Sequence, residues 1–126
     1  MQSYKELKVW QKSIDLTLFL YKAVLKFPKD ELYGLSSQIK RASVAIPSNI
    51  AEGFTRQHTA EYIQFLKIAF SSGAELETQL LIANKLGFLP EKEFDRLSAD
   101  LSELMRMLNG LIQKLKTNRQ LLVPNH

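Results

Sequence analysis

Hydrophobic residues recur at steps of three and four along most of the 126-residue chain. This spacing places them on one face of an α-helix, which turns once every 3.6 residues. No stretch of useful length alternates apolar and polar residues as a half-buried strand does. The longest helical run comprises Phe94, Leu97, Leu101, Leu104, Leu108, Leu111 and Leu115. The pattern therefore predicts an all-α protein.

Short breaks divide this pattern into four predicted helices, which cover about residues 4–27, 35–54, 59–86 and 90–116. Pro28 ends the first helix, because the residue before a proline avoids the helical region. Thr59 is expected to cap the third helix, and Gly87 to end it in a left-handed conformation. Pro90 opens the fourth, where its missing N–H costs nothing.

Helices of this length joined by short loops lie antiparallel to their neighbours. We therefore predict an up-down antiparallel four-helix bundle. The bundle domain is expected to span residues 1–118, and residues 119–126 are expected to form a disordered tail because nothing in them fixes the chain.

The first and third predicted helices carry more apolar surface than one core requires. In the first helix, the stripe expected to face the core comprises Leu7, Trp10, Ile14, Leu18, Tyr21 and Leu25. Further apolar residues, such as Val9, Leu16 and Leu20, widen that face. A helix that is apolar nearly all round is expected to be buried on more than one side, and homo-oligomerisation is the simplest way to bury it. A well-covered monomer core is the alternative.

The second helix contains a proline and a glycine at positions where helices usually avoid them. Pro47 removes one backbone hydrogen bond and presses on the carbonyl of Ser43, which costs about 3 kcal/mol if nothing compensates. A proline-kinked helix is expected. Gly53 removes side-chain bulk where another backbone can approach.

Polar residues fall on or near the inward positions of the second and third helices, and two interpretations stay open. One is a polar pocket or partner surface around Asn49 and Glu52. The other is a buried network that fixes the register between the two helices, with Arg41 included. The residues of this predicted polar network are Gln38, Asn49, Glu52, Ser72, Glu75 and Glu77.

Composition removes most catalytic and metal chemistry. The chain has no cysteine, so it has no disulfide, thiolate metal site or cysteine nucleophile. Neither His58 nor His126 follows a glutamate at the spacing that di-metal helical bundles use. No glycine-rich phosphate loop is present. We therefore predict no enzyme, no catalytic residue, no bound metal and no cofactor.

Two further features bear on location. The N-terminus carries charges where a signal peptide would need an apolar core. No apolar run approaches the roughly 20 residues that a membrane-spanning helix needs. We therefore expect a cytoplasmic protein without a membrane partner.

The net charge of +4 is unevenly distributed along the chain: residues 1–58 carry nine basic and five acidic residues, and residues 59–126 carry eight of each. This asymmetry indicates an anionic partner, with a solvated basic surface as the alternative. Lys5, Lys8 and Lys12 follow helical steps and are predicted to form a ridge. Such a ridge binds phosphates by counterion release without reading bases. Lys40, Arg41 and Arg56 add charge in and just after the second helix.

Several blocks of the sequence resemble the bacterial four-helix bundle proteins, also called 23S rRNA-intervening sequence proteins. The blocks are Tyr4–Trp10, Phe27–Leu35, Gln38–Ala42, Ile46–Gly53 and Glu75–Leu80. The resemblance covers about residues 4–115 and departs from the family at Ser71-Ser72, where Gly-Ser is usual. It implies an up-down bundle that assembles into a ring-like homo-oligomer, a homopentamer, and it brings no catalytic residues.

The same fold is similar to the accessory variability protein of diversity-generating retroelements, a basic pentameric barrel that binds nucleic acid and a reverse transcriptase. This similarity implies phosphate contacts at Lys5, Lys8, Lys12, Lys40, Arg41 and Arg56. We therefore predict a non-enzymatic oligomer that binds nucleic acid, structured RNA in particular, through charge and shape. The alternative is a protein-binding adaptor, for example for a polymerase or reverse transcriptase, without affinity for nucleic acid. A purely structural oligomer is a third possibility.

Overall fold

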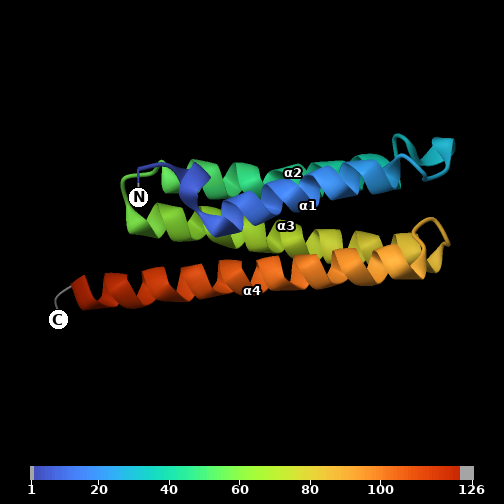
Figure 1. Ribbon diagram of the computed structural model, residues 1–126. Helices are drawn as coiled ribbons and strands as arrows, with labels where there is room; N and C mark the ends of the chain where they lie inside the picture. Colours follow the sequence, from blue (N-terminus) through green and yellow to red (C-terminus); the bar gives the residue numbers. More distant parts are fainter. Residues whose placement is uncertain (1, 123–126) are drawn as a thin grey trace.

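Four long helices form the body of the molecule. They are α1 (Lys8–Val24), α2 (Leu35–Phe54), α3 (Thr59–Lys85) and α4 (Glu91–Leu122), with short 3-10 helices η1 (Tyr4–Glu6) and η2 (Lys29–Glu31) before α1 and α2. The computed structural model describes residues 2–122, and that range contains no strand. Consecutive helices run antiparallel (Figure 1). The predicted up-down four-helix bundle is confirmed.

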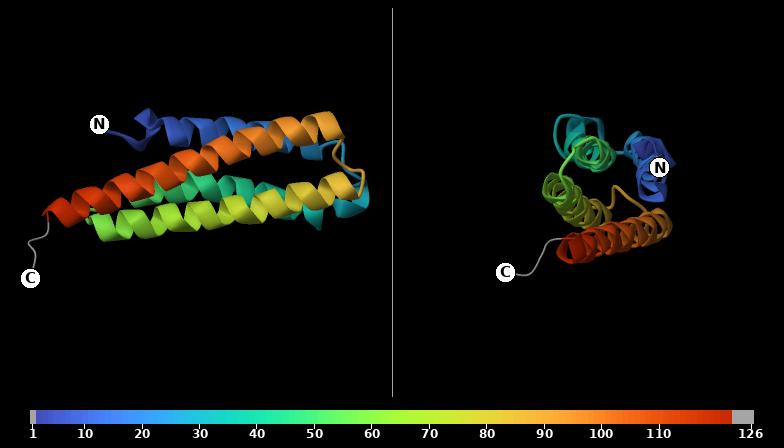
Figure 2. Two further views of the ribbon diagram at one scale, coloured as in Figure 1. Left: turned by 90° about the horizontal axis from the view of Figure 1, so that it is seen from below. Right: turned by 90° about the vertical axis from the view of Figure 1, so that its left-hand side faces the viewer.

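The helices follow one another around the core, and α4 crosses the bundle obliquely. In Figure 2, α4 lies beside α1 where it begins and beside α3 toward its end. The loop between α2 and α3 lies at one end of the bundle, where α1 begins and α4 ends (Figure 1). We call this the α2–α3 loop end. The other two interhelical loops lie at the opposite end.

The core is formed by the inward faces that the periodicity predicts for α2 and α4. In α2 these buried residues are Leu35, Ile39, Ala42, Ile46 and Ile50, and in α4 they include Leu97, Leu101, Leu104 and Leu108. Both stripes repeat at steps of three or four, as a single buried helix face requires. The hydrophobic pattern therefore located the core of these two helices correctly.

In α1, by contrast, the predicted core stripe is wrong. Leu18, Tyr21 and Leu25 are exposed, Leu25 to 79%. The buried residues of this helix are Val9, Ser13, Leu16, Leu20 and Val24. The polar Ser13 interrupts the apolar pattern of this stripe and so hides its periodicity. Ser13 can be buried because its hydroxyl donates to the carbonyl of Trp10 at 2.6 Å. Trp10 packs against the core.

The first helix also begins later than predicted. The side chain of Ser3 accepts a hydrogen bond from the backbone N–H of Lys5 at 3.1 Å and so caps η1. Leu7 then adopts an extended conformation (φ −71°, ψ 123°), which separates η1 from α1. Lys5 is therefore not on the same helix as Lys8 and Lys12, and the predicted single ridge is interrupted.

Of the two ends predicted for α3, the structure confirms the C-terminal one and corrects the N-terminal one. His58, without a side-chain hydrogen bond, occupies the N-cap, so the cap predicted at Thr59 is wrong by one residue. At the other end Gly87 has a φ of +82°, as predicted. The N–H of Phe88 donates to the carbonyl of Ala83 at 2.9 Å. With the bond from Gly87 to Asn84 at 3.0 Å, this is the Schellman arrangement that satisfies terminal carbonyls.

Helix α4 is longer than predicted, because it continues to Leu122 rather than ending near residue 116, and it passes the predicted domain boundary at residue 118. No glycine or proline occurs from residue 111 to 123, so no residue with a strong helix-breaking tendency interrupts it there. Residues 123–126 of the predicted tail lie outside the described residues.

A side chain of α1 compensates for the proline inside α2. The helix continues without interruption through Pro47, which cannot donate to the carbonyl of Ser43. Thr17 Oγ1 donates to that carbonyl at 3.2 Å, and it shares its hydrogen with the carbonyl of Ser13 at 2.8 Å. The hydrogen bond that the proline removes is thus replaced across the α1–α2 contact. The kink itself stays a prediction.

Gly53 lies where α2 and α3 approach each other closely. A Cβ atom added there would lie 2.7 Å from the Cβ of Phe65 and 3.1 Å from the ring of Tyr62. Real Cβ atoms do not approach this closely, so a side chain at position 53 would push the helices apart. The prediction that Gly53 admits another backbone is confirmed.

Candidate nucleic-acid interface

The six predicted phosphate contacts lie in different environments. Lys5, Lys8 and Arg41 are exposed, and no carboxylate of residues 2–119 lies within 4.0 Å of them. Lys12 Nζ pairs with Glu103 Oε2 of α4 at 3.2 Å. The two exposed lysines and the arginine are thus better placed for an external anion than Lys12.

Lys40 is half-buried, and its ammonium lies 5.2 Å from the centre of the Tyr21 ring. This is a cation–π contact between α2 and α1. It uses the charge of Lys40 within the molecule. The exposure of Arg41 also rules out the interpretation in which a buried polar network contains it.

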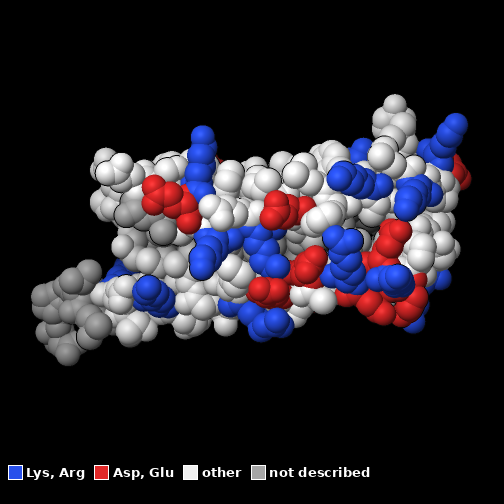
Figure 3. Space-filling model, viewed as in Figure 1, with Lys and Arg blue, Asp and Glu red and all other residues white. Residues whose placement is uncertain are grey.

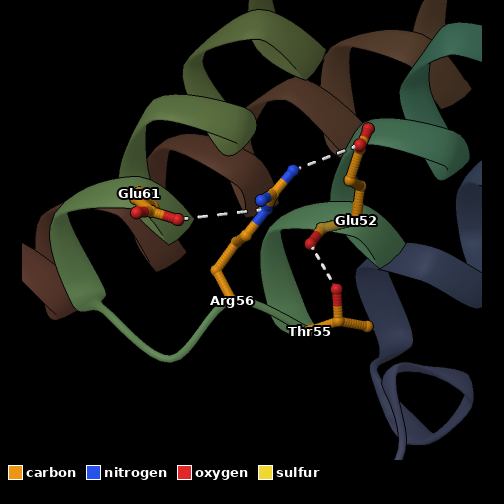
Figure 4. A network of polar contacts seen from close by, with 4 residues as sticks. All are labelled: Glu52, Thr55, Arg56 and Glu61. Carbon is orange, nitrogen blue, oxygen red and sulfur yellow. Dashed lines mark hydrogen bonds and ion pairs between the residues drawn. The ribbon is translucent and has the colours of Figure 1, made fainter.

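Arg56 lies between two carboxylates. Its Nη2 is 3.3 Å from Glu52 Oε1, and its Nε is 4.0 Å from Glu61 Oε2 (Figure 4). The guanidinium also lies 4.8 Å from the centre of the Phe65 ring. Thr55 Oγ1 donates to the carbonyl of Glu52 at 2.7 Å and steadies the same turn. These contacts connect the two ends of the α2–α3 loop. The charge of Arg56 is therefore engaged within the protein and is less available to a phosphate.

The predicted polar network between α2 and α3 is not formed within the described chain. Asn49 Nδ2 donates to the carbonyl of Ala45 in its own helix at 2.8 Å. Glu75 Oε1 accepts from Gln79 Nε2, also within one helix, at 3.1 Å. The remaining four residues of the predicted network have no hydrogen bond across the α2–α3 contact. Ser72 is half-buried, and the exposed ones are Gln38, Glu52 and Glu77.

The physical reason is that the contact between α2 and α3 is too close and too apolar for long polar side chains. At Gly53 it leaves no room even for a Cβ atom, and the buried residues of both helices are almost all apolar. Polar side chains beside it bond to groups of their own helix instead. The buried polar group that sequence reasoning missed is Gln79, whose Oε1 has no hydrogen-bond partner among the described residues.

Contacts between neighbouring helices show which residues lie at the same level of the bundle. Thr17 of α1 is opposite Ser43 of α2. Gly53 of α2 is opposite Phe65 of α3, and Gly73 of α3 is opposite Met105 of α4. These pairs divide the bundle into two halves at consistent levels. The half at the α2–α3 loop end comprises residues 2–14, 46–72 and 106–122.

Charge is separated between these two halves. The α2–α3 loop end holds nine basic and three acidic residues, a net charge of +6. The other half, residues 15–45 and 73–105, holds eight basic and ten acidic residues, a net charge of −2. Figure 3 shows one face of the molecule, on which most acidic side chains lie over the middle and the half where α4 begins. The asymmetry follows the bundle axis rather than the order of the chain.

The last part of α4 supplies the basic residues that sequence reasoning missed. No aspartate or glutamate follows Glu103. The basic residues in this stretch are Arg106, Lys114, Lys116 and Arg119. Counting the charge of residues 59–126 as one segment combined these basic residues with the acidic residues at the start of the same helix, so the net charge was zero. The acid-free run was the signal that could have found them.

Three grooves border α4: one toward α1 and two toward α3, of which the smaller, about 240 Å³, is lined by residues that include Glu77 and Arg106. The groove toward α1 has a volume of about 310 Å³ and is lined by residues that include Phe19, Lys22 and Lys26. Lys26 Nζ pairs there with Glu93 Oε1 at 3.3 Å, and the guanidinium of Arg96 lies 4.4 Å from the centre of the Phe19 ring. Two of the three cations of this groove thus have internal partners, whereas Lys22 has no carboxylate of the described residues within 4.0 Å.

The larger groove toward α3, which we call the α3–α4 groove, also has a volume of about 310 Å³. No aspartate or glutamate lines it. Its lining residues are Lys67, Phe70, Ser71, Asn109, Ile112, Gln113 and Lys116. This groove lies at the α2–α3 loop end, in the half that carries the positive charge.

Other chemistry is sparse in the described part of the chain. No group of three or more potential metal ligands occurs among residues 2–119. Burial raises the pKa of the Tyr62 phenol above its ordinary value of 10.0. No helix within residues 2–122 is both long enough and apolar enough to span a membrane.

These observations define an all-helical up-down bundle with one strongly basic end. Residues 5–110 match the family of 23S rRNA-intervening sequence proteins, and the chain belongs to that family. The similarity to the retroelement protein stays a prediction.

Among solved structures, the bundle is similar to that of a protein of unknown function from the S23 ribosomal protein family of Bacteroides thetaiotaomicron. The TM-score is 0.75 and the sequence identity 24%, over 82% of this chain and 97% of that one. At this identity the likeness shows the fold alone. No curated protein matches the sequence.

Proposed function

We propose that the protein is a non-enzymatic, cytoplasmic homo-oligomer that binds structured RNA by its phosphate backbone. The observation that supports this function is the net charge of +6 at the α2–α3 loop end. Phosphate binding by counterion release requires several cations on one surface, and it requires no shaped catalytic pocket. Some exposed cations at this end have no carboxylate of residues 2–119 within 4.0 Å, and they include Lys5, Lys8, Lys114 and Arg119.

Exposed apolar residues support the homo-oligomeric part of the proposal. Leu18 and Leu25 lie on the outer face of α1, and Ile68 and Ile82 lie exposed on α3. A second copy of the chain can bury such surfaces. A homopentamer would bring together five chains of net charge +4 each, or +20 in total. A field of that size attracts RNA far more strongly than one chain does.

The test is binding of the purified protein to a structured RNA hairpin and to duplex DNA across a salt series. Affinity is expected to fall steeply with salt, and Lys5→Glu/Lys8→Glu is expected to weaken binding by about tenfold or more. Lys85→Glu/Lys92→Glu is the matched control, since it makes the same charge change on exposed lysines of the other half. Equal losses in both variants, or no binding at low salt, would overturn the proposed interface.

A protein-binding adaptor is the second candidate, and the loop between α1 and α2 favours it. Leu32 and Tyr33 are exposed there, Tyr33 to 93%, beside the exposed Leu25. Exposed apolar clusters of this kind mark surfaces for protein contact. The adaptor function predicts that Leu25→Asp/Tyr33→Asp abolishes binding of a purified polymerase or reverse transcriptase partner. It also predicts that the wild-type protein has no affinity for RNA even at low salt.

A further inference from the structure

The groove between α3 and α4 differs chemically from the rest of the surface. Its volume of about 310 Å³ lies in the lower part of the range of small-ligand pockets, roughly 300–1,000 Å³. Figure 2 shows the two helices side by side where α4 approaches its end. The polar and aromatic residues that line the groove are Lys67, Phe70, Ser71, Asn109, Gln113 and Lys116.

Both lysines of this groove lack a carboxylate partner. No carboxylate of the described residues lies within 4.0 Å of Lys67 or Lys116. On their own helices, the positions three and four residues away carry no aspartate or glutamate. Lys116 is half-buried and lines the groove, whereas Lys67 is exposed. Two ammonium groups without internal partners at one groove favour an anionic ligand.

The other lining groups favour more than a bare anion. Phe70 is partly buried against the core, and this packing fixes its position. An aromatic ring at a positively charged groove is the usual platform for a nucleic-acid base. Asn109 and Gln113 are exposed amides that lie four residues apart on α4. Each carries both donors and an acceptor, as the hydrogen-bonding edge of a base requires.

We propose that this groove binds one nucleotide of a single-stranded RNA or DNA segment. Lys67 and Lys116 hold the phosphate, the base lies against Phe70, and the amides of Asn109 and Gln113 contact its edge. This inference rests on the proposed function and adds to it a contact with an unpaired base. An inorganic anion would engage the lysines but neither the ring nor the amides.

The experiment compares an eight-residue oligouridylate with an abasic oligonucleotide of the same length and charge. The wild-type protein is expected to bind the oligouridylate about tenfold more tightly, because stacking contributes to each bound base. Asn109→Ala/Gln113→Ala is expected to reduce that preference, because it removes the contacts to the edge of the base and leaves the stacking on Phe70. Lys67→Met/Lys116→Met is expected to weaken binding of both oligonucleotides and to reduce the salt slope by about 1, because the two lysines hold one phosphate. Methionine keeps most of the aliphatic length of lysine.

Lys85→Met/Lys92→Met is the control, with the same substitutions on exposed lysines of the other half, and it is expected to keep the preference. Asn109 and Gln113 are exposed, so their alanine variants are expected to fold. Equal, salt-dependent affinity of the wild-type protein for both oligonucleotides would overturn the base contact and leave the proposed function standing. Loss of the preference in the control pair would overturn the assignment to this groove. No binding of either oligonucleotide at low salt would overturn the assignment of a nucleotide to this groove, and it would overturn the proposed function as well only if the RNA hairpin is also not bound.

Discussion

Helix α4 borders two grooves of about 310 Å³ each, and they differ in charge compensation rather than in size. In the groove toward α1, Lys26 pairs with Glu93, and Arg96 lies over an aromatic ring. In the groove toward α3, Lys67 and Lys116 have no carboxylate among the described residues within 4.0 Å. The first groove therefore uses two of its three cations for contacts within the chain and leaves only Lys22 uncompensated, whereas both lysines of the second are available to an external anion.

The difference comes from the path of one helix. The acidic residues of α4 all lie between Glu91 and Glu103, and its later part carries only basic charge. Because α4 runs obliquely, its acidic part lies beside α1 and its basic part beside α3 (Figure 2). A change of charge along a single helix is thus converted into a difference between two faces of the bundle.

The largest effect is expected from overpacking the contact between α3 and α4 at Gly73. A Cβ atom at Gly73 would lie 3.1 Å from Cγ of Met105, so Gly73→Leu forces α4 away from α3. Overpacking of this kind typically lowers the free energy of unfolding by about 1–3 kcal/mol. Urea denaturation measures it. Gly110→Ala is the control, because nothing lies within 4 Å of a Cβ atom there. That variant is expected to gain about 0.5–1 kcal/mol, and an unchanged Gly73→Leu protein would contradict the close contact.

The second prediction gives the α3–α4 groove the carboxylate that it lacks. Asn109→Glu places a negative charge between α3 and the end of α4, and the affinity for an eight-residue oligouridylate is expected to fall by about tenfold. Fluorescence anisotropy at low salt measures this affinity. Asn118→Glu makes the same change on the same helix at an exposed position that does not line the groove, and it is expected to have a smaller effect. Equal losses would mean that only the overall charge matters.

The third prediction removes a carboxylate from the other groove. Glu93→Gln frees Lys26 and is expected to raise the affinity of the α1–α4 groove for inorganic phosphate by about threefold to fivefold. The free energy of unfolding should change by less than about 1 kcal/mol, because exposed ion pairs contribute little. Phosphate titration followed by the NMR signals of the Lys26 side chain measures the gain. Unchanged affinity would show that ion pairing does not keep this groove closed to anions.

The smallest effect is expected at the close α2–α3 contact, where the titratable Tyr62 lies beside Gly53. The raised pKa of Tyr62 means that the unfolded chain loses this proton first as the pH rises above about 10. Stability from the neutral phenol is therefore complete below that pH and is lost as the pH rises toward the folded-state pKa. Tyr62→Phe is expected to flatten the fall of the unfolding free energy in this range. Tyr33→Phe, at a position 93% exposed, should leave the curve unchanged.

Much of the fold could be predicted because local signals agreed with tertiary packing. The bounds of α2 at Leu35 and Phe54 coincide with the prediction, and Gly87 ends α3 in the left-handed conformation. These features depend on periodicity and on the intrinsic geometry of glycine. The core stripe of α1 could not be chosen in the same way, because two stripes of that helix are apolar and Ser13 interrupts the buried one.

The candidate site was less predictable, because it depends on which helices meet. Lys12 and Arg56 carry positive charge in the sequence, but only the structure shows that Glu103 and Glu61 lie beside them. Lys67 and Lys116 are 49 positions apart in the chain, and they line one groove only because α4 returns antiparallel to α3. Spacing along a helix reports neighbours on that helix and nothing about its partners.

The hydroxyl of Thr17 and the ring of Pro47 also have an evolutionary consequence. The hydrogen bond from Thr17 to the carbonyl of Ser43 offsets the donor that Pro47 lacks. If the proline is replaced, that carbonyl regains a backbone donor and the hydroxyl loses its role there. If the threonine is replaced first, the carbonyl of Ser43 loses this donor and the proline then lowers the stability of the protein. Among relatives of this protein, these two positions should therefore change together, and the order in which they change should favour loss of the proline before loss of the threonine.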